Sequence, residues 1–188
     1  SSNNYQTFVF NASKKCLYTN YEYTSFTDQF TTHFGVNAGT YYFAVRTYES
    51  TYVINTDFTA TTSKTSSKRS GAILLKRGVT KTGTLALNGP SSSWYKIRLT
   101  SSRKVKIDAK AMVGGAGNYG DIQVDIYRIS DATSSPSLIT SLSSYSPSKT
   151  LNPYTIGNNN KLPAGTYYIR VTKYHNGNGG YSLKWSYR

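Results

Sequence analysis

The chain has 188 residues, which is enough for one large domain or two small ones. Its 22 basic and 8 acidic residues give a net charge of +14, which favours polyanionic partners, although the charge could serve solubility alone. The 18 tyrosines are typical of an all-β protein, good helix formers never cluster with a helical period, and no apolar run is long enough to cross a bilayer.

Two groups of short strands are expected along the chain. The first group lies within residues 1–62, with strands at 6–11, 15–18, within 21–34, at 40–48 and within 52–62. Residues 63–71 are rich in Ser, Thr and Lys without an apolar period, which is typical of a linker. The second group lies within residues 72–188, with strands at 72–75, 82–87, 94–99, 104–110, 122–129, 138–142, 166–172 and 181–185.

Alternation within the second group indicates which side chains are buried. Short strands with turn signals between them at this spacing predict an antiparallel β-sandwich. We expect strand 94–99 to pair with 104–110, and segment 164–171 to form a hairpin with 180–185. The residues expected to fill this second core are Tyr167, Ile169, Val171, Leu183 and Trp185.

A repeat divides the chain into two related units. Ala38-Gly39-Thr40-Tyr41-Tyr42 recurs as Ala164-Gly165-Thr166-Tyr167-Tyr168, and residues 7–10 correspond to 124–127. The first copy has little chain before it. Residues 1–62 are therefore expected to be the back half of one module, and residues 72–188 a whole one. The missing strands are expected upstream of an excised fragment, with supply by another chain or partial replacement by residues 72–75 as the alternatives. Phe8, Phe10, Tyr41, Phe43 and Val45 are expected to need a covered core in the incomplete first unit.

The second unit resembles the bacterial pre-peptidase C-terminal domain family, which is related to the collagen-binding domains of collagenases. The matching segments are 83–85, 94–100, 122–127, 162–171 and 180–185, within a region of roughly residues 78–188. The resemblance implies a jelly-roll-like sandwich that serves as an accessory domain of a secreted enzyme. The expected fold class is therefore all-β, with two tandem antiparallel jelly-roll-like sandwich modules of which the first is incomplete.

The sequence departs from this family where relatives carry acidic residues. Ser91-Ser92-Ser93 stands where relatives commonly place Asp, and the segment before the first strand is basic. Asp121 and Asp125 alone do not supply the several oxygen ligands that calcium requires. We therefore expect no cofactor, and calcium is the one metal that the resemblance leaves open.

No catalytic constellation is recognisable. The two histidines, His33 and His175, lie near neither each other nor a pair of carboxylates in sequence, and acidic residues are sparse. The single cysteine cannot form an internal disulfide. We therefore expect a protein that is not an enzyme.

Two sets of outward side chains are candidate binding residues. A basic face is expected from Lys96, Arg98, Lys104, Lys106, Lys110, Arg170 and Lys184. Aromatic contacts to a ligand are expected from Tyr127, Tyr168 and Tyr174, with Tyr42 and Tyr48 equivalent in the first unit. The alternatives are a solvated sheet face without a partner and tyrosines that pack across strands.

The sequence supports two functional hypotheses of different kinds. The first is an accessory binding module pair of a secreted or surface-attached bacterial protein, held on an anionic cell-wall or host glycan or on a fibrous protein such as collagen. The second is a structural subunit of an extracellular assembly, because an incomplete sandwich exposes strand edges that a neighbouring chain, such as another copy of the protein, could complete. We expect an extracellular or cell-surface location, no membrane span and no nucleic-acid partner.

Overall fold

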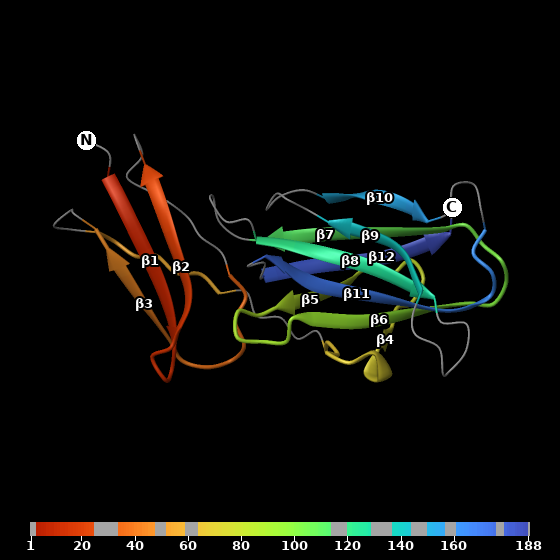
Figure 1. The fold of residues 1–188 in the computed structure, drawn as a ribbon, viewed down its shortest axis with the longest axis horizontal. Coiled ribbons are helices and arrows are strands. Elements are labelled where there is room, and N and C mark those ends of the chain that lie inside the picture. Colours follow the sequence, from red (N-terminus) through yellow and green to blue (C-terminus); the bar gives the residue numbers. More distant parts are fainter. Residues whose placement is uncertain are drawn as a thin grey trace.

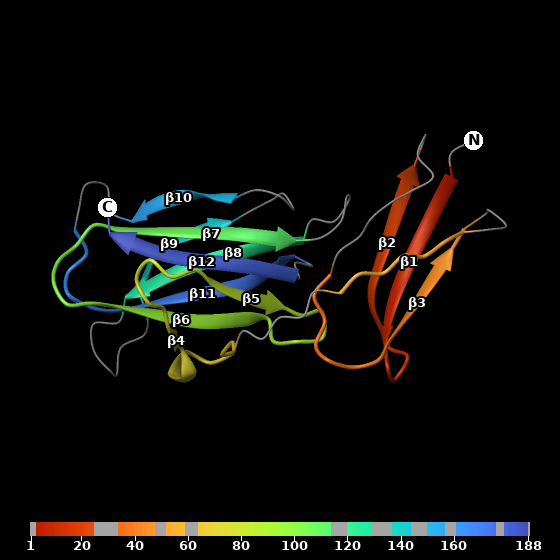
Figure 2. The ribbon, with the colours of Figure 1, turned by 180° about the vertical axis from the view of Figure 1, so that it is seen from behind.

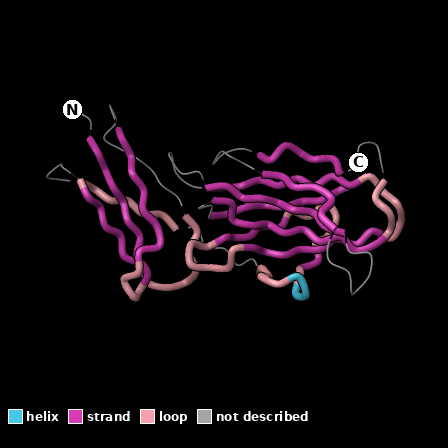
Figure 3. The backbone as a smooth tube through the Cα atoms, viewed as in Figure 1, coloured by secondary structure: helices cyan, strands magenta, loops and turns pink. Residues whose placement is uncertain are grey.

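The computed structural model describes residues 3–24, 34–47, 52–58, 64–113, 120–128, 137–143, 150–156, 161–175 and 179–187. These residues form strands and one short helical turn, Arg69–Gly71 (Figure 3). The predicted all-β fold class is therefore confirmed.

The first strands form a small sheet of their own. Strands β1 (Asn3–Asn11), β2 (Cys16–Thr24) and β3 (Tyr41–Arg46) are antiparallel, in the order β2-β1-β3. This sheet lies at one end of the molecule, and β3 is the strand farthest from the rest of the chain (Figure 1).

The remaining strands form a two-sheet sandwich. The strands are β4 (Ile73–Leu74), β5 (Lys81–Leu85), β6 (Ser92–Leu99), β7 (Val105–Val113), β8 (Gly120–Arg128), β9 (Ser137–Ser143), β10 (Thr150–Ile156), β11 (Gly165–His175) and β12 (Gly179–Tyr187). One sheet has the order β4-β6-β11-β8-β9, and the other has the order β10-β7-β12-β5. Neighbours are antiparallel except for β4 and β6. The predicted antiparallel sandwich is therefore present in the second unit.

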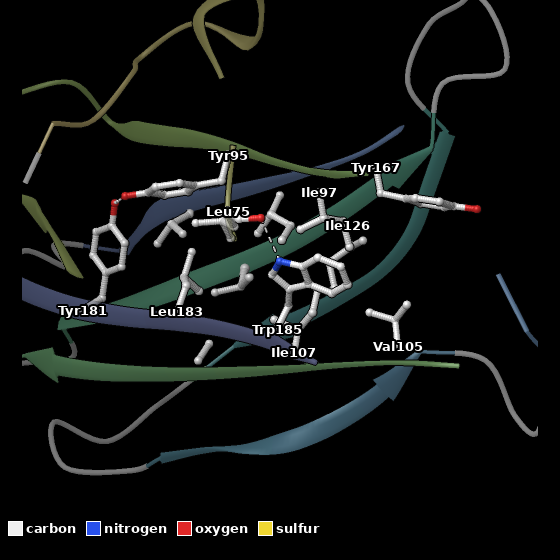
Figure 4. Packing of buried hydrophobic residues seen from close by; sticks show 14 of the residues in the cluster. Leu75, Tyr95, Ile97, Val105, Ile107, Ile126, Tyr167, Tyr181, Leu183 and Trp185 are labelled. Carbon is white, nitrogen blue, oxygen red and sulfur yellow. Dashed lines mark hydrogen bonds between the residues drawn. The ribbon is translucent and has the colours of Figure 1, made fainter. Parts of the chain in front are cut away.

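The core lies between these two sheets and consists of alternate residues of their strands. The five predicted core residues are confirmed, since Tyr167, Ile169 and Val171 are 0% exposed, Leu183 is 1% and Trp185 is 4% exposed. The Trp185 indole lies across the core and its Nε1–H donates to the Leu75 carbonyl at 2.9 Å (Figure 4). The buried indole thus satisfies its one donor.

Two tyrosines meet inside the sandwich. The hydroxyls of Tyr95 and Tyr181 are 2.8 Å apart, and the two rings pack edge to face (Figure 4). Gly83 on β5 makes room for them, because a Cβ there would lie 2.4 Å from Cζ of Tyr181. Burial raises the pKa of both phenols above the ordinary value.

The raised pKa values predict a loss of stability at alkaline pH. A phenol whose folded-state pKa is raised contributes stability that is complete below about pH 10 and is lost as the pH rises above it. The free energy of unfolding, measured by urea denaturation, should therefore fall as the pH rises above about 10. The variant with both Tyr95→Phe and Tyr181→Phe should fall less steeply, and equal slopes for the two proteins would contradict this prediction.

The two predicted hairpins are wrong. β6 and β7 belong to opposite sheets, and so do β11 and β12. Their connections pass from one sheet to the other, across the roughly 10 Å that separates packed sheets, instead of turning back beside the same strand. The outward faces of β6 and β7 consequently point in opposite directions.

The expectation of one shared core in the first unit is also wrong. Val9 is buried on the face that β1 shares with Tyr18 and Phe43, whereas Phe8 and Phe10 lie on the other face and stack on each other at 6.1 Å. Phe34 covers the Val9 face, with ring centroids 5.8 Å from Tyr18 and 5.7 Å from Phe43.

The segment before β3 joins the small sheet to the sandwich. Gly35 is buried against the sandwich, and its carbonyl accepts a hydrogen bond from the Leu87 amide at 2.8 Å. The Asn88 side chain donates to the Tyr41 hydroxyl at 2.9 Å. Leu87 and Asn88 belong to the turn that follows β5. The Lys173 ammonium of β11 donates to the carbonyl of Ala86 in the same turn, and desolvation lowers the pKa of Lys173. This turn therefore contacts both β11 and the first unit.

The expected linker makes contacts with the sandwich in its described part. The Ser66 carbonyl accepts a hydrogen bond from the Trp94 amide at 2.7 Å, and the short turn Arg69–Gly71 follows directly. Residues 64–71 therefore run beside β6. The division of the chain into modules at residues 1–62 and 72–188 remains our proposal.

Candidate binding surfaces

A charged and aromatic cluster lies on the outer face of the five-stranded sheet. Asp125 of β8 is 1% exposed, and Arg170 of β11 reaches its Oδ2 with Nη2 at 2.6 Å and Nε at 3.2 Å. The register places Arg170 between Asp125 and Trp94, its partners on β8 and β6. Asp125 also accepts from Gln123 Nε2 at 2.7 Å and from the Tyr127 hydroxyl at 3.1 Å. The carboxylate is thus fully engaged within the sheet.

Two rings flank the guanidinium of Arg170. Its Cζ lies 5.6 Å from the Trp94 centroid and 5.3 Å from the Tyr127 centroid, and the two rings are 5.7 Å apart. Burial, and to a lesser degree the Asp125 charge, raise the pKa of Tyr127, while the nearby Arg170 lowers it in part. The cluster is a rigid, partly exposed patch of cation and aromatic faces.

A second row of side chains crosses the same face beside the cluster. Lys96, Tyr168 and Tyr127 are directly paired across β6, β11 and β8, and each is half-buried. Arg98 follows on β6 and is exposed. Among the described residues, neither Lys96 nor Arg98 forms a salt bridge. Lys96, which is paired across the strands with Tyr168, and the exposed Arg98 therefore lie on the same face.

The predicted seven-residue basic face is wrong as a single surface, because it rested on the β6–β7 hairpin. Lys96, Arg98 and Arg170 belong to the five-stranded sheet, whereas Lys106, Lys110 and Lys184 belong to the four-stranded sheet. Lys104 precedes β7. Lys106 is paired with Asp108 at 3.1 Å, and Arg170 is paired with Asp125. The chain therefore carries two smaller basic faces on opposite sides of the sandwich.

The predicted tyrosine contacts have different surroundings. Tyr168 is half-buried beside Lys96, Tyr127 is bound to Asp125, and Tyr42 on the first unit is 49% exposed. The side chain of Tyr174 and the whole of Tyr48 lie outside the described residues. Whether any of these tyrosines contacts a ligand remains a prediction.

Sequence reasoning missed Trp94, Gln123 and the engagement of Asp125. The alternation of β6 already placed Trp94 outward, because Tyr95 and Ile97 point inward. It did not reveal that β8 and β6 flank β11, and only that order brings Trp94, Arg170 and Asp125 together.

A further pair of cations went unnoticed at the far end of the sandwich. Cζ of Arg77 lies 4.6 Å and Cζ of Arg103 5.6 Å from the ring centroid of Tyr187. The bridge between Arg103 and Leu162 fixes the backbone at Arg103. Residues distant in sequence meet at this ring, which no local pattern indicates.

We searched the described residues for a metal site and for a membrane-spanning helix. They contain no cluster of three or more His, Cys, Asp and Glu side chains that could hold a metal ion. Asp125 is bound by its neighbours, and the side chain of Asp121 lies outside the description. The same residues contain no helix of the length and hydropathy needed to cross a membrane.

The chain was compared with family models, curated proteins and solved structures. No family model matches the sequence, and no curated protein is significantly similar to it. Among solved structures, the chain is similar to the pre-peptidase C-terminal domain of collagenase from Bacillus anthracis, with 19% identity and a TM-score of 0.45. The match covers 61% of this chain and 94% of that one. At this TM-score the likeness supports no statement about ligand or activity, and the fold rests on the strand order described above.

Proposed function

We propose that this chain is a non-catalytic accessory binding module pair of a secreted or surface-attached bacterial protein. It would hold its parent protein on an extracellular polymer, with an anionic cell-wall or host glycan as the preferred ligand. A fibrous protein such as collagen is the next candidate. The motifs that resemble the pre-peptidase C-terminal family support the accessory role, and the net charge of +14 supports an anionic ligand.

The observation that carries this proposal is the outer face of β6, β11 and β8. Lys96 and Arg98 lie there without acidic partners among the described residues, and Lys96 is paired across the strands with Tyr168. Cations next to aromatic faces suit a sugar chain with acidic groups, since rings stack on sugars and ammonium or guanidinium groups bind carboxylates and sulfates. The Arg170–Asp125 pair stiffens the sheet beneath this face.

Paired charge reversals on the two sheets test this face. We expect the chain to bind a sulfated or uronic glycan, less tightly as salt rises, because exposed charges are screened over about 8 Å at physiological ionic strength. Lys96→Glu with Arg98→Glu should weaken binding about tenfold or more, because each lost contact is worth up to about 1 kcal/mol and reversal adds repulsion. The measurement is retention on glycan and collagen surfaces at two salt concentrations.

The control has the same change of charge on the opposite sheet. Lys110→Glu with Lys184→Glu should leave most of the glycan binding intact, because these exposed lysines lie on the other side of the sandwich. An equal loss of glycan binding in both double variants would mean that only net charge matters. A third variant, Arg77→Glu with Arg103→Glu, tests the cations at Tyr187, and a loss of binding in this variant alone would place the site there. Either outcome would contradict the face proposed here.

The second candidate function is a structural subunit completed by strand addition. The observation that favours it is the open edge of β3, which has one hydrogen-bonded neighbour, β1, among the described strands. An open edge is a template for pairing with another strand.

A further inference from the structure

The small sheet repeats three neighbouring strands of the sandwich in the same register. Val9 faces Phe43 as Ile126 faces Ile169, and Thr7 faces Val45 as Val124 faces Val171. The offset that relates the two Gly-Thr-Tyr-Tyr segments also relates Phe43 to Ile169. The order β2-β1-β3 therefore corresponds to β9-β8-β11.

This correspondence shows what is missing beside β3. In the second unit the other edge of β11 is hydrogen-bonded to β6 along most of its length. The matching edge of β3 has no strand beside it among the described residues, and it is turned away from the sandwich (Figure 2). Phe43 on β3 is 40% exposed, whereas its counterpart Ile169 is 0% exposed.

The segment after β3 also lacks the strand neighbours that its counterpart has in the facing sheet of the second unit. By the same offset, residues 53–58 correspond to 179–184, which belong to β12 and lie between β7 and β5. Residues 52–58 form no strand in the structure. Their apolar side chains are exposed, at 85% for Val53, 80% for Phe58 and 48% for Ile54. An apolar segment of strand-like sequence thus lacks the sheet that would bury it.

We propose that the first unit is an acceptor for a polypeptide segment with the strand pattern of β4 to β7. Such a segment would add a β6-like strand to the open edge of β3. It would also supply β5-like and β7-like strands, between which residues 52–58 would become a strand like β12. The second unit defines the occupant, because in its described part β6 covers the edge of β11 opposite β8, and β12 lies between β7 and β5.

A folded second copy of this chain does not fit as the occupant. Its own β6 and β7 are committed to its sandwich, where Tyr95, Ile97, Val105 and Ile107 are 0% exposed. Offering them to a neighbour would require that sandwich to unfold. The acceptor role is independent of the glycan-binding proposal, since it involves neither Lys96 nor Arg98.

The test supplies the missing strands from the chain's own sequence. A fusion places an extra copy of residues 72–119 directly before residue 3, so that the added strands lead into β1 as β7 leads into β8. We expect backbone amides of β3 and of residues 52–58 to exchange with solvent on the order of tenfold more slowly in the fusion than in the chain alone. The control fusion carries Tyr95→Asp and Ile97→Asp in the added copy only, and its exchange should match the chain alone.

Two outcomes would overturn the proposal. One is that the amides of β3 and of residues 52–58 exchange at the same rate in the fusion as in the chain alone, although the original second unit of the fusion remains folded. The other is that these amides are protected equally in the fusion and in the control fusion. Light scattering of the chain alone over a concentration series gives a separate check. A stable dimer in which β3 and residues 52–58 become protected would show that a second copy is the occupant after all.

Discussion

Replacing Trp185 with alanine should lower the free energy of unfolding by about 3–5 kcal/mol, the usual cost of deleting a large buried aromatic. The indole is 4% exposed and packs edge to face with Tyr187 at 5.7 Å. Its loss would leave a cavity between the sheets and would remove the donor to the Leu75 carbonyl. Urea denaturation followed by far-ultraviolet circular dichroism measures the change.

The second tryptophan provides the control for this prediction. Trp94 is half-buried on the outer face, where it stacks on Tyr127. Trp94→Ala should therefore cost only about 0.5–1.5 kcal/mol, the value of an aromatic pair. Trp185→Phe should cost about 1–3 kcal/mol, because it keeps a ring in the core but leaves the Leu75 carbonyl without its donor. Similar losses for the two alanine variants would show that Trp185 does not anchor the core.

The burial of the second unit could be predicted from the sequence because alternation along a strand reports which face is covered. Every second residue of β6 from Tyr95 to Leu99 is buried, as the pattern indicates. The same alternation carries no information about which strand lies beside another. Both predicted hairpins failed for this reason, and with them the single basic face, because outward residues of β6 and β7 lie on opposite sides of the molecule.

The repeat carried information that alternation did not. The predicted correspondence of residues 7–10 with 124–127 agrees with the observed register, in which β1 pairs with β3 as β8 pairs with β11. The buried face of the first unit was nevertheless predicted wrongly. Phe8 and Phe10 form the more apolar face of β1, and Thr7 and Val9 form the other face. The buried residue is nevertheless Val9, which is the counterpart of the buried Ile126. Among the described residues no second sheet packs against β1, β2 and β3, so hydrophobicity alone does not show which face of this sheet is buried.

The Arg170 cluster shows which feature of a site escapes sequence reasoning. Arg170 was predicted to be a free cation on a basic face, and the structure pairs it with a carboxylate that is 1% exposed. The pairing depends on β8 lying beside β11 in a register that aligns Asp125 with Arg170. An outward position on an isolated strand therefore identifies a candidate contact but does not show whether its charge is already neutralised.

Removing the positive partner of Asp125 should be the most damaging change on the outer face. Arg170→Met would remove the guanidinium paired with the buried Asp125 carboxylate and would keep the hydrogen bonds from Gln123 and Tyr127. Breaking a buried pair in this way costs about 3–5 kcal/mol, and we expect about 3 kcal/mol because the Arg170 side chain is 35% exposed and water reaches it. Arg170→Lys should recover part of this loss, since an ammonium keeps the charge but cannot offer two nitrogens to Oδ2.

A double-mutant cycle separates the charge from the packing. Asp125→Asn in the Arg170→Met background removes the carboxylate charge while keeping an oxygen acceptor and nearly the same volume. The double variant should therefore be more stable than Arg170→Met alone, and the coupling energy between the two positions should lie at the upper end of the 0.5–3 kcal/mol typical of contacting groups. If Asp125→Asn instead destabilises both backgrounds equally, the two side chains do not act as a pair. Arg170 would then be a cation available to a ligand. The outer face of β6, β11 and β8 would offer three such cations, Lys96, Arg98 and Arg170, in place of two.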